Sequence, residues 1–131
     1  MKATELMIGN WVKIKGDYGK PLKITTIDDT YNSINYFDGD AEGELTLQLN
    51  EIEPIPLTNE ILEKSGFSCK GHDHYHFEWR DYYVLAAYPR LGGSTEIFFQ
   101  SYKMKYRGVI RFVHQLQQAL MFCEIEKEIV L

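Results

Sequence analysis

The sequence predicts an α+β protein in which a small SH3-like β-barrel or curled sheet comes first, followed by a short helix, an antiparallel β-sheet and a C-terminal amphipathic helix. Aromatic side chains are abundant, with nine Tyr, seven Phe and two Trp, and they suit a half-buried pleated surface. Apolar and polar residues alternate in short runs up to residue 57, and the spacing becomes helical from residue 107. The 131 residues suffice for a barrel-like subdomain at 1–57 and an α+β subdomain at 58–131, or for one compact domain.

Four or five short strands are expected in the first subdomain, and such strands bury their apolar side most simply by curling into a small barrel. Stretches rich in Gly, Asp or Pro at 15–21 and 38–43 separate them as turns. Pro54 and Pro56 cannot donate to a central ladder, so residues 52–57 form an edge strand or an exit linker. The apolar positions of the other strands are Trp11, Val12, Ile14, Leu22, Ile24, Ile34, Tyr36, Leu45, Leu47 and Leu49.

The second subdomain is expected to begin with a short helix that Thr58 or Asn59 caps and Gly66 ends. A three-stranded antiparallel sheet follows at 74–80, 82–88 and 95–102, with a hairpin turn at 90–94. A helix at 107–124 completes the chain, because its apolar residues recur at spacings of three and four. The stripe consists of Val109, Val113, Leu116, Leu120 and Cys123, widened by Phe112, Ala119 and Phe122.

Composition and charge narrow the classes of function. Two cysteines, Cys69 and Cys123, are too few for a disulfide framework or a paired-cysteine metal site. The sequence has no export signal and no run of about 18 apolar residues, so we expect a cytoplasmic protein that does not cross the membrane. Residues 1–66 carry a net charge of −6 and residues 67–131 a net charge of +1. The acidic first half disfavours nucleic acid as a partner, because like charge repels the phosphate backbone.

Three stretches of the chain resemble a family of small proteins from gut-type bacteria that are associated with prophages and mobile elements. They are Ile8-Gly9-Asn10-Trp11-Val12, the run from Ile52 through Pro54, Pro56, Thr58 and Leu62 to Phe67, and Val113-His114-Gln115-Leu116-Gln117. The resemblance implies that most of the chain is one structural unit. It implies no activity, cofactor or catalytic residue, and it does not reach residues 68–106.

Three histidines alternate in the segment that follows the short helix. His72, His74 and His76 share one face if they lie on a strand, and neutral imidazoles about 6 to 7 Å apart can converge on one metal ion such as zinc. The alternative is a solvated strand face or loop whose histidines titrate near neutral pH and bind nothing. No cofactor is expected apart from this candidate metal.

A second alternating set is basic. Lys103, Lys105 and Arg107 lie at every second position and Arg111 follows one helical turn later, which is typical of an anion or nucleic-acid site when tyrosines are interleaved. The alternative is a solvated edge strand whose charges prevent association between sheets.

Aromatic residues of the first subdomain supply a third candidate site. Tyr18, Tyr31 and Tyr36, with Trp11, can line a shallow cleft that binds a peptide, or they can belong to the core of the barrel.

The sequence contains no nucleotide-binding loop, zinc-protease or serine-hydrolase motif, so we expect no enzyme. The favoured hypothesis is a non-enzymatic protein-binding or adaptor protein, with self-association equally open. The alternatives are a nucleic-acid-associated accessory protein and a metal-binding protein.

Overall fold

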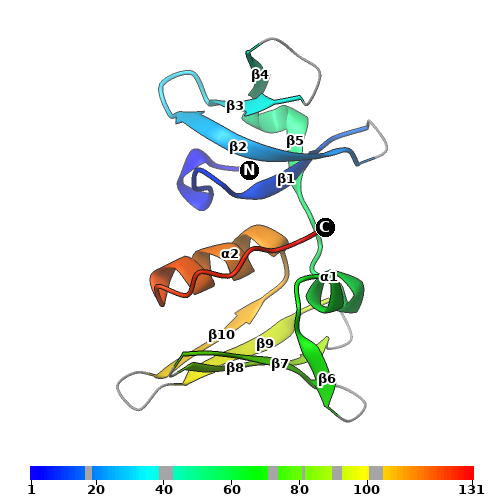
Figure 1. Cartoon of the computed structure of the whole chain (residues 1–131). Helices are drawn as coiled ribbons and strands as arrows, with labels where there is room; N and C mark the ends of the chain where they lie inside the picture. The colour runs from blue at the N-terminus through cyan, green and yellow to red at the C-terminus, as the bar shows by residue number, and fades with distance from the viewer. Residues whose placement is uncertain (17–18, 39–42, 71–73, 81, 90–92, 101–104) are drawn as a thin grey trace. The chain divides into compact units, whose positions relative to one another are not determined.

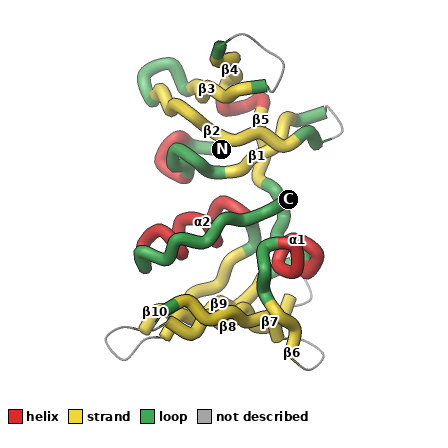
Figure 2. The backbone as a smooth tube through the Cα atoms, in the orientation of Figure 1, coloured by secondary structure: helices red, strands yellow, loops and turns green. Residues whose placement is uncertain are grey.

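A computed structural model describes residues 1–16, 19–38, 43–70, 74–80, 82–89, 93–100 and 105–131 (Figure 1). The chain divides into two compact units, Met1–Ile55 and Pro56–Leu131. In the residues so described, each unit contains a five-stranded antiparallel sheet and the second unit contains two α-helices, so the protein is of the α+β class (Figure 2). In the described part of the chain, no helix is long and apolar enough to cross a membrane.

The first unit is a sheet with the strand order β4-β3-β2-β1-β5. A short 3-10 turn, η1 (Ala3–Glu5), precedes the sheet, and a second one, η2 (Leu49–Glu51), joins its last two strands. The strands are β1 (Trp11–Ile14), β2 (Pro21–Asp28), β3 (Ser33–Phe37), β4 (Glu44–Gln48) and β5 (Ile52–Pro54). Among the described residues no strand pair joins β4 to β5, so barrel closure stays a prediction.

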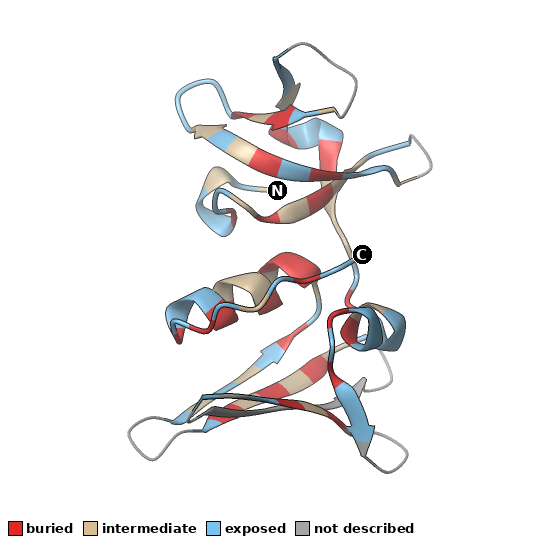
Figure 3. Ribbon diagram, viewed as in Figure 1, coloured by how far each residue is buried: buried red, intermediate tan, exposed pale blue. Residues whose placement is uncertain are grey.

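The core of the first unit comes from alternate residues of neighbouring strands. Val12 lies opposite Leu22, and Ile24 lies opposite Tyr36, and all four side chains are buried. Figure 3 shows this alternation of buried and exposed positions along β2. The period of two in the sequence therefore predicted the buried side of β2 correctly, but it was wrong for Leu45 on β4, which is 38% exposed.

The Ile8-to-Val12 stretch has a structural role. The buried side chain of Asn10 accepts a hydrogen bond from the Met7 amide at 2.8 Å through Oδ1, and its own backbone amide donates to the Met7 carbonyl. Gly9 has φ +90°, a conformation that favours glycine. Because the backbones of Gly9 and Asn10 also bond to Ile24, this turn fixes the start of β1 against β2.

The second unit is an antiparallel meander with the strand order β10-β9-β8-β7-β6. The expected three-stranded sheet was too small, because residues 68–70 and 105–110 also form strands that pair with its two edges. Its helices are α1 (Asn59–Lys64) and α2 (Val113–Phe122), and α2 lies over one face of the sheet (Figure 1). Val113, Leu116 and Leu120 of α2 are buried, as are Ile97 and Phe99 of β9. The strands are β6 (Ser68–Lys70), β7 (His74–Trp79), β8 (Tyr82–Pro89), β9 (Thr95–Gln100) and β10 (Lys105–Ile110).

The helix expected at 107–124 is shorter than the sequence analysis predicted. Residues up to Ile110 belong to β10, and Phe112 is still extended, with φ −125° and ψ 152°. The side chain of Gln115 accepts hydrogen bonds from the amides of Arg111 and Phe112 at 2.7 and 3.1 Å, which caps the helix at this point. The apolar stripe was also wrong in two places, because Val109 and Phe122 are 60% and 71% exposed.

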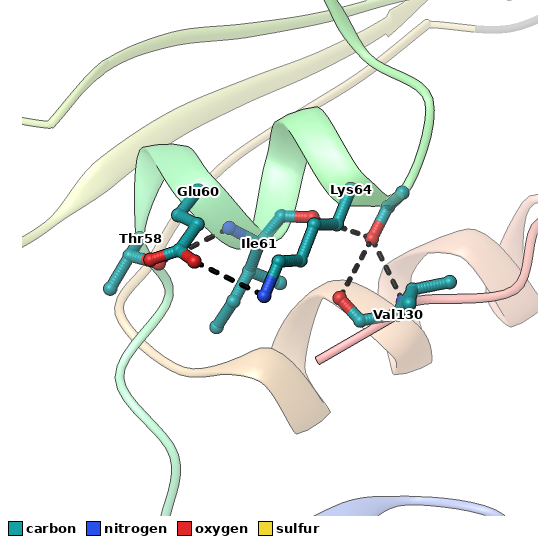
Figure 4. Close-up of polar contacts among 6 residues, drawn as sticks. Thr58, Glu60, Ile61, Lys64 and Val130 are labelled. Carbon is teal, nitrogen blue, oxygen red and sulfur yellow. Dashed lines mark hydrogen bonds and ion pairs between the residues drawn. The ribbon is translucent and has the colours of Figure 1, made fainter.

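The capping of α1 is confirmed. The Thr58 hydroxyl accepts a hydrogen bond from the Ile61 amide at 3.2 Å, and Glu60 pairs with Lys64 at 3.1 Å (Figure 4). Gly66 has φ +90° at the end of the helix, as expected of a C-terminal glycine. The expected turns at 38–43 and 90–94 and the end of the strand expected at 95–102 lie largely outside the described residues.

The last residues of the chain pack on the second unit. Ile125 and Ile129 are buried, and the Lys127 ammonium lies 5.3 Å from the centre of the Phe77 ring. The buried Ser65 hydroxyl accepts a hydrogen bond from the Val130 amide at 2.9 Å and donates one to the Ile61 carbonyl at 2.7 Å. The end of α1 and the C-terminal segment are thereby joined.

Candidate functional site

A hollow of about 640 Å³ opens on the first unit. Three segments line it: the N-terminal residues through η1, the turn between β2 and β3, and η2 with the end of β4. Lys15, at the start of the loop after β1, completes the wall. We call this surface the η2 hollow.

Hydrogen bonds between these segments fix the shape of the η2 hollow. The Asp28 carboxylate accepts a bond from the Tyr31 amide at 3.1 Å and so closes the turn after β2. The Leu49 amide donates to the Asn32 carbonyl at 2.8 Å, and the Lys15 amide donates to the Glu51 carbonyl at 2.9 Å. The turn between β2 and β3 and the Lys15 segment are therefore both joined to η2 through the backbone.

The lining combines an exposed aromatic ring with polar groups. Tyr31 is 72% exposed, whereas Leu49 is buried beneath the surface. Lys2 and Lys15 bring positive charge and Asp29 brings negative charge. The lining also contains Asn32, Gln48 and Asn50, whose side-chain amides have both donor and acceptor groups. Such a lining can offer a ring for apolar contact and polar partners for the hydrogen-bonding groups of a ligand.

The structure separates the tyrosines that the sequence analysis grouped. Tyr31 lines the η2 hollow, but Tyr36 is buried in the core of the sheet and borders a smaller hollow of about 180 Å³ together with Trp11 and Phe37. Above Trp11 the Lys23 ammonium lies 5.9 Å from the ring centre. Tyr18 lies outside the described residues.

Two of the three candidate histidines lie on β7. His74 and His76 are two residues apart on this strand, where their backbones pair with Ala87 and Leu85 of β8, and His72 lies outside the described residues. Across the described ranges, no group of three or more His, Cys, Asp or Glu side chains is placed to hold a metal ion. The three-histidine site stays a prediction.

Of the basic residues, Lys105, Arg107 and Arg111 are exposed, and Lys103 lies outside the described residues. Lys105 and Arg107 share one face of β10, and Arg107 lies 3.9 Å from the Glu96 carboxylate of β9. The alternative of a solvated edge strand agrees with the position of β10 as the last strand in the described sheet. Sequence reasoning missed that exposed Met121 and Phe122 lie at the end of the neighbouring helix. The alternation of basic residues from 103 to 107 was the signal for this strand.

Two titratable groups of the second unit are shifted by burial. Burial, followed by the hydrogen bond that the Tyr75 hydroxyl donates to Glu63 at 3.0 Å, raises the pKa of Tyr75 to about 12. Burial also raises the pKa of the Cys123 thiol, which favours the neutral, unreactive form. Both shifts are typical of packed structural groups.

Comparison of the chain with protein-family models, with curated proteins and with solved structures finds no match. The proposals below therefore depend on the residues and their geometry.

Proposed function

We propose that residues 1–55 form an SH3-like module that binds a peptide segment of a partner protein at the η2 hollow, and that the chain is a non-enzymatic adaptor. The observation that carries the proposal is the 72% exposed ring of Tyr31 on the rim of a hollow of about 640 Å³. The position of this ring beside a preformed hollow supports the proposal, because its apolar surface is buried only when a partner arrives.

The strand order supports the SH3-like part of the proposal. In small barrels of this type a meander of four strands is followed by a short helical turn and a fifth strand that pairs with the first. Here β5 pairs with β1 and η2 lies between β4 and β5. The η2 hollow lies where the turn between β2 and β3 meets η2.

The origin of the chain is part of the same proposal. Asn10, Thr58 and Gln115, from the three stretches that resemble the prophage-associated bacterial family, hold a turn and two helix starts. We infer a bacterial mobile-element origin from that resemblance, and it adds no activity to the binding function.

A random dodecapeptide library displayed on phage tests the proposal on the full chain. Selected peptides should bind the wild-type chain. Their affinity for Tyr31→Ala should be lower by about tenfold or more, the size of effect expected of a central aromatic contact. Phe37→Ala is the matched control, because Phe37 is 58% exposed and lines the other hollow of the same unit. Equal loss in both variants, or no selected peptide that distinguishes wild type from Tyr31→Ala, would contradict the proposal.

A further inference from the structure

Strand β10 ends the second sheet in the part of the chain that the structure describes. Antiparallel pairing uses the backbone groups of alternate residues, so half of the N–H and C=O groups of β10 point away from its partner β9. Near its end the chain approaches Pro56, which bridges to Phe112, so the open stretch is residues 105–109. Such an edge can pair with an added strand.

We propose that this open stretch, the β10 edge, binds an acidic extended segment of a partner protein as an additional antiparallel strand. The two faces of the edge differ, and the difference defines the partner. Lys105, Arg107 and Val109 are exposed on one face. On the other face Tyr106 packs toward Phe99 and Phe122, with ring centres 5.4 and 6.1 Å apart.

An added strand would place its alternate side chains on these two faces. Side chains on the first face would lie beside Lys105 and Arg107, with Arg111 just beyond, so acidic residues fit there. Side chains on the second face would lie near Phe122, which is 71% exposed at the end of α2, so apolar residues fit there. The expected partner is a segment in which acidic and apolar residues alternate.

Charge argues against a second copy of β10 as the occupant. If the open stretch pairs with itself about its centre, Arg107 lies opposite Arg107 of the second copy. A shift of the pairing toward Lys105 brings Lys105 opposite Arg107. Like charges directly opposite each other destabilise an antiparallel pair, whereas an acidic strand relieves the same repulsion.

Nucleic acid fits the β10 edge less well than an acidic peptide. Val109, Met121 and Phe122 are 60%, 48% and 71% exposed, and such aliphatic and aromatic surface is not a phosphate contact. The backbone groups of the edge, in contrast, match those of an extended peptide.

The test uses the full chain, labelled with ¹⁵N, and a blocked nonapeptide in which Glu and Val alternate. Titration should shift the amide signals of residues 105–109 and of Phe122, with a Kd below about 1 mM. Hydrogen exchange should slow at alternate amides of the β10 edge, because an added strand protects only the N–H groups that point outward. The same peptide with Lys in place of Glu should leave these signals unchanged.

Two double variants separate this site from a general charge effect. Lys105→Gln with Arg107→Gln should weaken binding about fivefold, as expected when two exposed ion pairs are lost. Lys64→Gln with Arg80→Gln removes the same charge from exposed positions elsewhere in the second unit and should leave the Kd unchanged.

Three results would overturn the proposal. These are shifts outside the β10 edge and Phe122, equal weakening in both double variants, and uniform rather than alternate protection. Dimerisation through β10 in the absence of peptide, or tighter binding of a 20-nucleotide oligothymidylate to the same amides, would replace the acidic segment by a different occupant. Since Tyr31→Ala lies in the other unit, failure at the η2 hollow and failure at the β10 edge are measured independently.

Discussion

Replacement of Ser65 by alanine tests the contact that joins α1 to the C-terminal segment. The Ser65 side chain is 3% exposed, and its hydroxyl bonds to the Val130 amide and to the Ile61 carbonyl at 2.9 and 2.7 Å. In Ser65→Ala the Ile61 carbonyl keeps the hydrogen bond from the residue 65 amide. The Val130 amide has no such replacement among these contacts.

The magnitude follows from these two contacts. A hydrogen bond contributes about 1 kcal/mol net, and Ser65→Ala removes both bonds of the hydroxyl while the Ile61 carbonyl keeps another donor, so we expect a loss of about 1.5 kcal/mol. A unit of this size has a urea dependence of about 1 kcal/mol/M, so the midpoint of unfolding should fall by about 1.5 M.

The assay is urea unfolding followed by NMR, because separate amide signals report on each unit. The signals of Phe99 and Leu116 should disappear at lower urea in Ser65→Ala, while those of Val12 and Ile34 in the first unit keep their midpoint. Ser68→Ala is the matched control, since Ser68 is exposed. A loss below about 0.5 kcal/mol, or an equal loss in Ser68→Ala, would refute the assignment of the Ser65 contact.

Two further substitutions test a buried hydrogen bond in the first unit and a buried phenol in the second. Asn10→Ala removes a buried acceptor from the Met7 amide and should destabilise the first unit by about 2 kcal/mol, seen as an earlier loss of the Val12 signal; an equal shift at Phe99 would contradict this. The raised pKa of Tyr75 means that the fold favours the neutral phenol, so its contribution to stability is full below pH 10 and is lost as the pH rises from 10 to about 12. The melting temperature of Tyr75→Phe should therefore change less over this pH range than that of wild type, and parallel curves would exclude the assignment.

Patterns within one segment predicted the local structure well. The alternation at Leu22 and Ile24 identified the buried side of β2, and Thr58 and Gly66 marked the two ends of α1. Each of these signals depends on neighbours a few residues away, which the sequence contains directly.

The error at Val109 arose because this segment fits both the helical spacing of three to four residues and the strand spacing of two. Val109 lies four residues before Val113, which fits a helix, yet it is an exposed residue of β10. The strand prevails because Val109 pairs with Glu96 and Ile110 with Thr95 on β9, an interaction that the segment alone does not reveal.

The η2 hollow was only partly predictable for the same reason. Tyr31 was a candidate because of its residue type, but the walls depend on backbone bonds from Leu49 to Asn32 and from Lys15 to Glu51. These pairs are 17 and 36 residues apart in the chain. Such long-range contacts leave no pattern in the local sequence. For this reason Tyr31 and Tyr36 were expected to line the same cleft, whereas Tyr36 is buried in the core.

The contacts that close the second unit also set an order of events during synthesis. Pro56 bridges to Phe112 and Ser65 bonds to Val130, so the earliest residues of this unit are completed by its latest ones. Translation delivers those partners some tens of residues after α1, whereas the first unit has all of its strands once Ile55 has left the ribosome. A nascent chain therefore contains every strand of the first unit before it contains the residues that pair with Pro56 and Ser65 in the second.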